Sequence, residues 1–312
     1  MLGIGGQLHV LRPRCLGSLV VTGRRHFSED QAAEITAWMR NMKDFRKLEE
    51  DRIDLNRVHQ LFVTLPSRDG STGGPVVKPK MGDTLPLGHH LILFPPIVPG
   101  HQLHEDGTDS TYAAPPFLTR RMWAGGASIS IRKTPSRLDK MCKQLKQLSN
   151  SVGVAVTERR SHVFLPPRSE SSRPVRKVVQ FFDPTLSHFS FAFVPTPAML
   201  FRFSALTFNA HMIHLDPEFC RKVDGHPERL VHGPLTAMML LELMTKHTSP
   251  SQTISSYSYR AMNPLVVGKP VTLHGTWSRG KETVRLTAVD HLGQEGMTAD
   301  VRFEPRPSGI EQ

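Results

Sequence analysis

The densest group of side chains able to move protons or bind oxygen lies within the eight residues 209–216. It comprises an amide, two imidazoles and a carboxylate: Asn209, His211, His214 and Asp216. Apolar residues alternate with these polar ones, so the group is expected to sit at the edge of a dry interior. An imidazole has an unperturbed pKa near 6.5 and can both take and give a proton at neutral pH. The pattern predicts acid/base chemistry.

A second feature follows in Val231-His-Gly-Pro-Leu235, which reads as a turn that opens a buried helix. Glycine lets a ligand approach the backbone closely, and Pro234 suits the first turn of a helix, where a missing N–H costs nothing. The backbone N–H of Gly233, at the positive end of the helix dipole, could bind a developing oxyanion. One such donor contributes on the order of 3 kcal/mol in a transition state.

Each residue of the cluster has a predicted role and an alternative. His214 is the predicted acid/base, and Asn209 is predicted to orient a leaving hydroxyl group or a water molecule. His211 is either a second proton carrier or a structural donor. Asp216 either fixes the tautomer of a neighbouring imidazole or caps the helix that starts at Pro217-Glu218. His232 is expected to be a structural hydrogen-bonding residue, and the whole cluster could still be an ordinary set of satisfied core residues.

Composition sets broad limits. At 312 residues the chain can form one large domain or two of ordinary size. The formal net charge of +11 suggests a protein that binds nucleic acid. However, the positive charge is dispersed along the sequence, and no zinc-finger spacing or aromatic RNA-binding motif accompanies it. An acidic protein partner or an anionic cofactor tail fits this charge equally well. Three unpaired-looking cysteines, Cys15, Cys142 and Cys220, favour a reducing compartment.

The first 28 residues contain four arginines and no acidic residue, and Glu29 is the first acid. Apolar residues are interspersed with the arginines, and the segment ends in Arg24-Arg-His-Phe-Ser28. This pattern predicts a mitochondrial presequence over residues 1–28 and a location in the matrix. A disordered basic tail is the alternative.

No cofactor, metal ion or membrane insertion is expected. His89, His90, His101 and His104 lack the spacing of a zinc site. The glycine-rich run near the N-terminus precedes no strand–helix unit, so it does not predict a nucleotide site. No apolar run approaches the length of a membrane-spanning helix.

The periodicity of apolar residues predicts the elements that position the cluster. It favours helix over residues 30–61, short strands and long loops over 84–116, and a strand over Ala127–Ile131. Residues 132–184 are irregular, with a basic helix over 138–148, a mobile loop over 168–177 and a strand over 178–182 as candidates. A helix over 235–245 is apolar nearly all round, and four strand-like segments follow it at 254–260, 270–277, 283–290 and 295–303. One buried helix and an antiparallel sheet wrapped around it predict an α+β hot-dog arrangement.

These segments resemble a known family, the MaoC-like, hydratase-2 type of hot-dog dehydratases. Residues 203–235 and 254–303 resemble its C-terminal half, and 84–131 resemble the N-terminal half of its two-lobed members. The N-terminal resemblance rests on Asp106-Gly107, Pro115-Pro116 and the run Arg-Arg-Met-Trp-Ala-Gly-Gly at 120–126. Within the family the chain is most similar to the mitochondrial 3-hydroxyacyl-thioester dehydratases type 2, with the mesaconyl-CoA/3-methylfumaryl-CoA hydratases as near neighbours.

The resemblance implies a double hot-dog, with an N-terminal lobe over 29–184 and a C-terminal lobe over 185–312. It implies the reversible loss of water from a (3R)-3-hydroxyacyl thioester to give the trans-2-enoyl thioester. The thioester would be carried by acyl carrier protein in mitochondrial type II fatty acid synthesis, or by CoA, and a homodimer is possible. Arg120 and Arg121 could contact a pantetheine phosphate or an acidic carrier, or form a salt bridge between lobes. Trp123 and Phe208 are further predicted substrate contacts.

The chain departs from the wider family motif at Asn209 and His211 and from the two-lobed branch at Met212. The wider hydratase motif, Asp-x-Asn-Pro-hydrophobic-His, places its Asp on Asn209, its Asn on His211 and its last His on His214. The two-lobed branch normally shows Phe-Asn-x-His-Arg-Ile-His, and here Met212 stands in place of the Arg. Two alternatives therefore stay open: a CoA-ester hydratase for dicarboxylic or branched acids, and a non-catalytic protein that binds acyl thioesters.

Overall fold

The computed structural model describes residues 28–43, 51–110, 114–118, 120–131, 156–158, 160–165 and 179–306. Most side chains of the strand at 120–131 also lie outside the description. Three predicted segments fall outside it as well: the presequence except for Ser28, the basic helix at 138–148 and the loop at 168–177.

The described residues form helices, short 3₁₀ turns and an eight-stranded sheet. The helices are α1 (Glu29–Lys43), α2 (Leu55–Phe62), α4 (Pro197–Leu206), α5 (Pro217–Phe219), which continues as a π turn over Cys220–Asp224, and α6 (Gly233–His247). The strands are β1 (Arg120–Ile131), β2 (Val156–Thr157), β3 (Ser161–Leu165), β4 (Phe189–Phe193), β5 (Gln252–Ala261), β6 (Val271–Trp277), β7 (Thr283–Val289) and β8 (Glu295–Pro305). The 3₁₀ turns are His89–Ile92, Gly100–Gln102, Pro184–Leu186 and Met212–His214.

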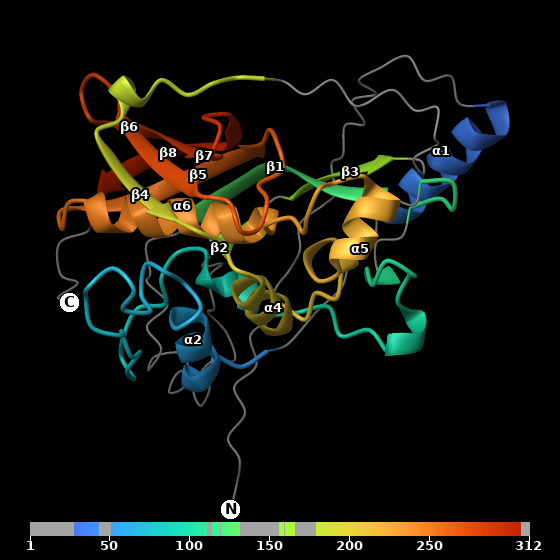
Figure 1. The fold of residues 1–312 in the computed structure, drawn as a ribbon, viewed down its shortest axis with the longest axis horizontal. Helices are drawn as coiled ribbons and strands as arrows, with labels where there is room; N and C mark the ends of the chain where they lie inside the picture. Colours follow the sequence, from blue (N-terminus) through green and yellow to red (C-terminus); the bar gives the residue numbers. More distant parts are fainter. Residues whose placement is uncertain are drawn as a thin grey trace, which may run out of the picture.

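The sheet is antiparallel throughout and runs in the order β2-β1-β5-β8-β7-β6-β4, with β3 pairing with β1. The four C-terminal strands predicted from the sequence are confirmed as β5 to β8. Strand β1 pairs with β5, from Gly125 opposite Arg260 to Ser130 opposite Ser256, so strands from the two halves of the chain share one sheet. Figure 1 shows β1 and β3 extending that sheet away from β5–β8.

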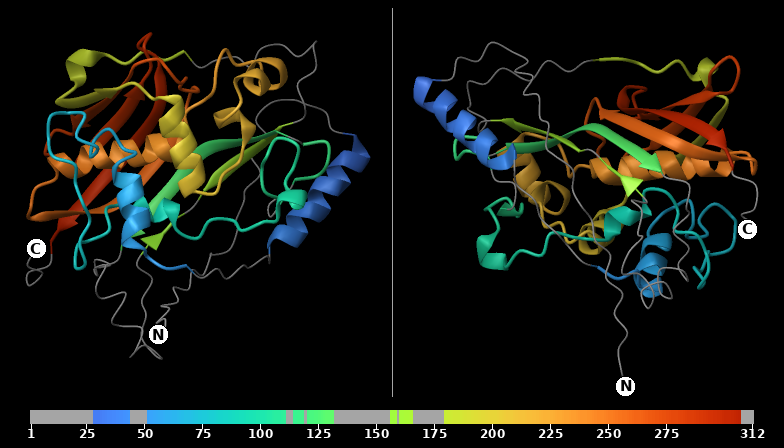
Figure 2. Two further views of the ribbon diagram at one scale, coloured as in Figure 1. Left: turned by 60° about the horizontal axis from the view of Figure 1, so that its bottom comes forward. Right: turned by 180° about the vertical axis from the view of Figure 1, so that it is seen from behind.

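Helix α6 is the centre of the fold. All ten residues from Leu235 to Met244 are buried, which explains why its sequence is apolar on every side. The helix lies along one face of the sheet, and α2 and α4 lie on its other side (Figures 1 and 2). The hydroxyl of buried Tyr257 on β5 donates to the carbonyl of Ala237, which ties the sheet to the helix. Among the described residues, no helix has both the length and the apolar character needed to cross a membrane.

Three predictions for the N-terminal half need correction. The continuous helix over 30–61 is wrong, because Asp54 is extended and caps the separate helix α2 by accepting from the N–H of Asn56. Short strands over 84–116 are also wrong: the apolar run at 91–94 is centred on a 3₁₀ turn that follows Gly88, whose φ is 83°. Of the strand expected at 178–182, the described residues 179–182 form an isolated bridge, between Phe181 and Gln294, and no regular strand. Two strands, β2 and β3, occur within the region that looked irregular.

A buried ionic cluster joins the N-terminal loops to α6. The carboxylate of Glu242 accepts from Nε and Nη2 of Arg68 at 2.6 and 2.9 Å and from Nε2 of His89 at 2.8 Å. The guanidinium of Arg68 also lies over the ring of Phe62 on α2, 4.5 Å from its centroid. The N-terminal loops therefore hold the central helix through an ionic cluster as well as through packing.

Candidate active site

The turn at residues 207–216, called the catalytic turn because it carries the candidate catalytic residues, begins where α4 ends. The N–H of Asn209 donates to the carbonyl of Ser204, and the N–H of His211 donates to Asn209 Oδ1 at 3.1 Å. Phe208 supports this reversal with φ of 51°, a region that non-glycine residues rarely occupy. Because a backbone N–H needs an oxygen acceptor, the amide of Asn209 is oriented with Oδ1 inward along the turn.

His214 is held in one tautomer. Its Nδ1–H donates to the carbonyl of Leu230 at 2.8 Å, which leaves Nε2 as the unprotonated, basic nitrogen. Burial, and secondarily the charge of nearby His211, lower the pKa of His214 to about 3. The ring is therefore neutral at physiological pH and ready to accept a proton.

His232 connects His214 to the amino end of α6. The two imidazoles stack with their centroids 3.6 Å apart and an interplanar angle of 22°. His232 Nε2 is hydrogen-bonded to Ser204 Oγ at 2.8 Å, and the ring is fully buried. Burial, followed by the charges of His214 and His211, lowers the pKa of His232 well below its usual value. His232 is the residue immediately before α6, so this stack brings the imidazole ring of His214 close to the first turn of that helix.

Gly233 begins α6 and, with Pro234, is partly exposed, whereas the following residues are buried. The first N–H groups of a helix have no partner within the helix, and the helix dipole makes this end positive. The backbone of Gly233 is therefore a donor directed out of the helix end and lies beside two neutral imidazoles.

A loop from the N-terminal half reaches this turn. The N–H of Met212 donates to the carbonyl of Asp106 at 2.8 Å, and Asp106 Oδ2 lies 3.6 Å from His211 Nε2. Gly107 has φ of 77°, and a Cβ there would clash with the carbonyl oxygen of Ala210. Only glycine permits this contact. Sequence reasoning had singled out Asp106-Gly107 only as part of a resemblance and had not assigned Asp106 to the site.

The structure thus brings together His214, His211, Asn209 and the start of α6 at Gly233. Arg120, Arg121 and Trp123 lie on β1, opposite β3, and their side chains are outside the described part of the chain. The ring of Phe208 is 60% exposed at the surface of the turn.

Asp216 settles one alternative left open by the sequence. Its Oδ1 accepts from the N–H groups of Glu218 and Phe219, at 2.7 and 3.2 Å, so it caps α5. Within the described ranges, no group of three or more His, Cys, Asp or Glu side chains is placed to hold a metal ion.

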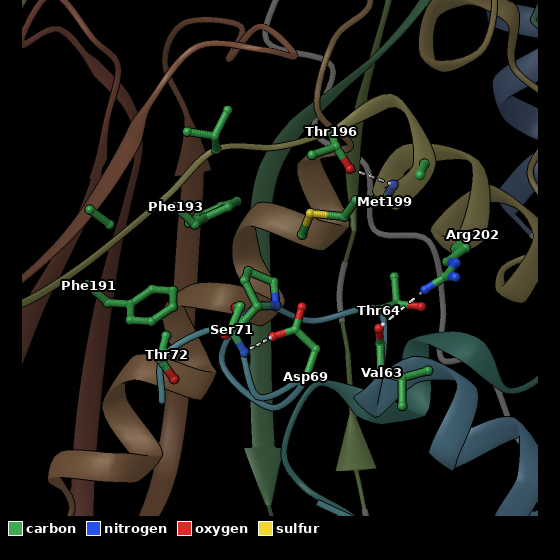
Figure 3. A pocket seen from close by; sticks show the side chains of 14 residues that line it. Val63, Thr64, Asp69, Ser71, Thr72, Phe191, Phe193, Thr196, Met199 and Arg202 are labelled. Carbon is green, nitrogen blue, oxygen red and sulfur yellow. Dashed lines mark hydrogen bonds between the residues drawn. The ribbon is translucent and has the colours of Figure 1, made fainter. Parts of the chain in front are cut away.

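A separate pocket of about 390 Å³ lies at the other end of α4. It is lined by the loop at 63–72, by β4 and by the first half of α4, including Asp69, Phe191, Thr196, Met199 and Arg202 (Figure 3). None of the histidines of the catalytic turn lines it. Of the site elements, only α4 borders both regions.

The sequence of the chain is similar to those of known proteins. A family model described as hydroxyacyl-thioester dehydratase type 2 matches residues 88–147 and 132–267, together more than half of the chain. The mesaconyl-C(4)-CoA hydratase of Chloroflexus aurantiacus is 30% identical over 239 residues, which are 69% of this chain and 81% of that protein. The mitochondrial hydroxyacyl-thioester dehydratase type 2 of Schizosaccharomyces pombe is 25% identical over 232 residues, covering 61% of this chain and 77% of the relative.

Among solved structures, HtdX from Mycobacterium tuberculosis aligns with a TM-score of 0.51 and 19% identity, over 81% of this chain and 98% of that one. At that identity the likeness concerns the fold alone. It confirms the predicted α+β hot-dog architecture, with the sheets of the two halves joined side by side.

Proposed function

Because the chain belongs to the hydroxyacyl-thioester dehydratase type 2 family, a group of thioester hydratases and dehydratases, we propose that it interconverts (3R)-3-hydroxyacyl thioesters and trans-2-enoyl thioesters. The observation that carries the proposal is the stack of His214 on His232 at the amino end of α6. It supports the proposal because the stack joins His214, whose tautomer is fixed by Leu230, to the residue that precedes Gly233.

His214 is the base in the dehydration direction. Its Nε2 takes the C2 proton of the substrate, and the Nδ1–H bond to Leu230 stabilises the imidazolium that forms. Because its pKa is lowered to about 3, the ring is in the accepting form across the physiological range. In the hydration direction the same nitrogen returns the proton to C2.

The thioester oxygen gains negative charge as the C2 proton leaves. The N–H of Gly233, at the positive end of α6, is the proposed donor to that oxygen, and loss of one such donor costs on the order of 3 kcal/mol. Asn209 has its oxygen committed to the N–H of His211, so its amide nitrogen is the part that would orient the departing or attacking water. His211 is the proposed second proton carrier.

Acyl carrier protein in the mitochondrial matrix is the proposed carrier and place of this reaction, within type II fatty acid synthesis. Two observations support it: the matched dehydratase of S. pombe is named as mitochondrial, and the chain carries a formal net charge of +11 that suits an acidic carrier. Arg120, Arg121, Trp123 and Phe208 remain proposed substrate contacts, and a homodimer remains a proposal.

A second candidate is hydration of a CoA ester of the mesaconyl type. It is favoured by the 30% identity to the mesaconyl-C(4)-CoA hydratase across 81% of that relative. Comparing turnover of medium-chain enoyl thioesters with turnover of mesaconyl-C(4)-CoA decides between the two candidates. A clear preference for the dicarboxylic ester would replace the first with the second.

The test of the proposed function is hydration of a trans-2-enoyl thioester by the purified chain and by two matched histidine variants. His214→Ala removes the base, and we expect a loss of at least about 100-fold in kcat. His291→Ala removes an exposed histidine in the turn between β7 and β8 and should retain the parent rate. A His214→Ala protein that is folded and fully active would refute the mechanism. Enoyl-thioester binding without turnover by the parent would instead support the non-catalytic alternative.

A further inference from the structure

The partly buried side chains near His211 include a carboxylate, that of Asp106, whose role the proposed mechanism leaves open. Asp106 comes from the N-terminal half of the chain, about a hundred positions before the catalytic turn. Its Oδ2 lies 3.6 Å from His211 Nε2, an ion-pair distance, and only 18% of its side chain and 15% of that of His211 are exposed. Holding two charges largely out of water costs desolvation free energy, so a pair retained at such a position suggests a function.

The loop geometry orients this carboxylate toward His211. Oδ1 accepts from both the N–H and the Oγ1 of Thr108, at 2.9 and 2.6 Å, so the other oxygen is the one that faces the imidazole. The carbonyl of Asp106 is fixed separately by the N–H of Met212. Both ends of the residue are therefore held, and the close approach of Gly107 to the catalytic turn leaves little freedom for the loop.

Other titratable groups near His211 lie on the catalytic turn and at the start of α6. His214, on the same turn, has its ring centroid 5.6 Å away at 82°, and His232 stacks on His214 from the start of α6. Asp216 is on the turn too, but its Oδ1 is directed at the N–H groups of α5. A neighbouring carboxylate favours the protonated form of an imidazole, and the carboxylate of Asp106 lies at ion-pair distance from His211.

We propose that Asp106 is a positioning residue that keeps His211 protonated, so that His211 is the general acid and His214 the general base of the reaction. The inference rests on the proposed function. The environments differ in the required sense: burial lowers the pKa of both His214 and His232, with His211 acting on each as a nearby positive charge. When two neighbouring titratable groups have environments that give them different pKa values, one can act as the acid and the other as the base.

The dehydration step then balances. The C2–H bond breaks and the proton goes to His214 Nε2, while its electron pair forms the C2–C3 double bond. The C3–O bond breaks, and the departing hydroxide takes a proton from the His211 imidazolium and leaves as water. The site ends with His214 charged and His211 neutral, and proton exchange through solvent restores the starting state. Hydration runs through the same steps in reverse.

Asp106→Asn tests the inference because it keeps the shape and removes the charge. We expect kcat to fall about 100-fold with little change in KM, consistent with the usual contribution of general acid catalysis. The alkaline limb of the pH–rate profile should also move to lower pH, because a neutral amide no longer favours the protonated His211. Asp106→Glu should recover part of the rate. Asp216→Asn is the matched control: it neutralises a carboxylate on the same turn that serves as a helix cap, so it should leave the alkaline limb in place.

A double-mutant cycle with His211→Gln separates this role from a purely structural one. If Asp106 acts through His211, adding Asp106→Asn to His211→Gln costs little more. Additive losses, an unmoved alkaline limb or a parent-like rate in Asp106→Asn would overturn the inference while leaving the proposed function intact. A parent protein that hydrates no enoyl thioester would overturn the proposed function itself, so the two failures are distinguishable.

Discussion

Replacing Glu242 by Gln is predicted to destabilise the protein more than any surface charge change. The carboxylate accepts four hydrogen bonds: two from Arg68, one from His89 and one from Ser67 Oγ at 3.1 Å. Gln would turn one acceptor oxygen into an NH₂ donor that faces other donors. Removing one partner of a buried pair typically costs about 3–5 kcal/mol, because the remaining charge is left buried and uncompensated.

The pKa shift of Glu242 gives a second value for the contribution of this carboxylate to the free energy of unfolding. Burial alone would raise the pKa of Glu242, but the bonds from His89 and Arg68 outweigh it and lower the pKa from 4.5 to about 2. His89 is fully buried and its pKa is lowered, so it acts as a neutral Nε2–H donor and Arg68 supplies the positive charge. A shift of this size corresponds to about 3 kcal/mol at 1.36 kcal/mol per pKa unit.

The sign of that term is fixed by the direction of the shift. A carboxyl group with a lowered pKa in the folded state stabilises the protein above its unfolded pKa of 4.5. The stabilisation is lost as the pH falls from 4.5 toward 2. Neutral, buried His89 adds to the loss in the same direction, because its unfolded form takes up a proton near pH 6.5. Glu242→Gln should therefore flatten the acid side of the stability–pH curve.

Urea unfolding followed by tryptophan fluorescence measures both effects. The control is Asp300→Asn, which breaks an exposed pair with Arg285 on the sheet; such pairs contribute at most about 1 kcal/mol. The expected result is a loss of free energy of unfolding at pH 7 of about 3–5 kcal/mol for Glu242→Gln and under about 1 kcal/mol for the control. Equal losses in the two variants, or an unchanged acid slope in Glu242→Gln, would refute the assignment of a stabilising buried cluster.

Three further predictions concern the site and its support. Gly107→Ala places a Cβ against the carbonyl of Ala210 in a backbone region that disfavours alanine, so we expect the catalytic turn to shift and kcat to fall at least about tenfold, measured by enoyl-thioester hydration. Tyr257→Phe leaves the carbonyl of Ala237 without its donor and should cost about 1–3 kcal/mol in thermal unfolding, with activity retained. Because the pKa of His214 is lowered to about 3, kcat/KM should show no acid limb near pH 6.5; a limb there would mean that the ring is solvated.

The C-terminal half was the part of the fold that the sequence predicted best. The helix over 235–245 and the four strands after it carry strong local signals, and α6 and β5–β8 match them within a few residues. Helix α6 and strands β5–β8 pack largely against one another, so the periodicity of apolar residues in their sequence matches the side chains that are buried. The break between α1 and α2 was missed, because Asp54 reads as one more polar residue on a helix surface until its cap is seen.

The candidate site was only half visible in the sequence. His211 and His214 are close together in the sequence and are easily recognised as candidates. The group that orients His214 is the backbone carbonyl of Leu230, which no sequence pattern reveals. Asp106 lies about a hundred positions upstream and reaches the turn only because Gly107 permits backbone contact. The sequence near Asp106 gives one sign of this tertiary contact, which is that a glycine follows the acidic residue.

The role of the N-terminal half follows from where it touches the rest of the molecule. Strand β1 extends the sheet beside β5, Arg68 and His89 fix α6 from its far side, and Asp106 reaches the catalytic turn. Within the described residues, the imidazoles proposed to take part in proton transfer, His211 and His214, belong to the C-terminal half. In the proposed mechanism, the N-terminal half therefore contributes a charge, through Asp106, and a backbone constraint, through Gly107, to a site whose histidines lie in the other half.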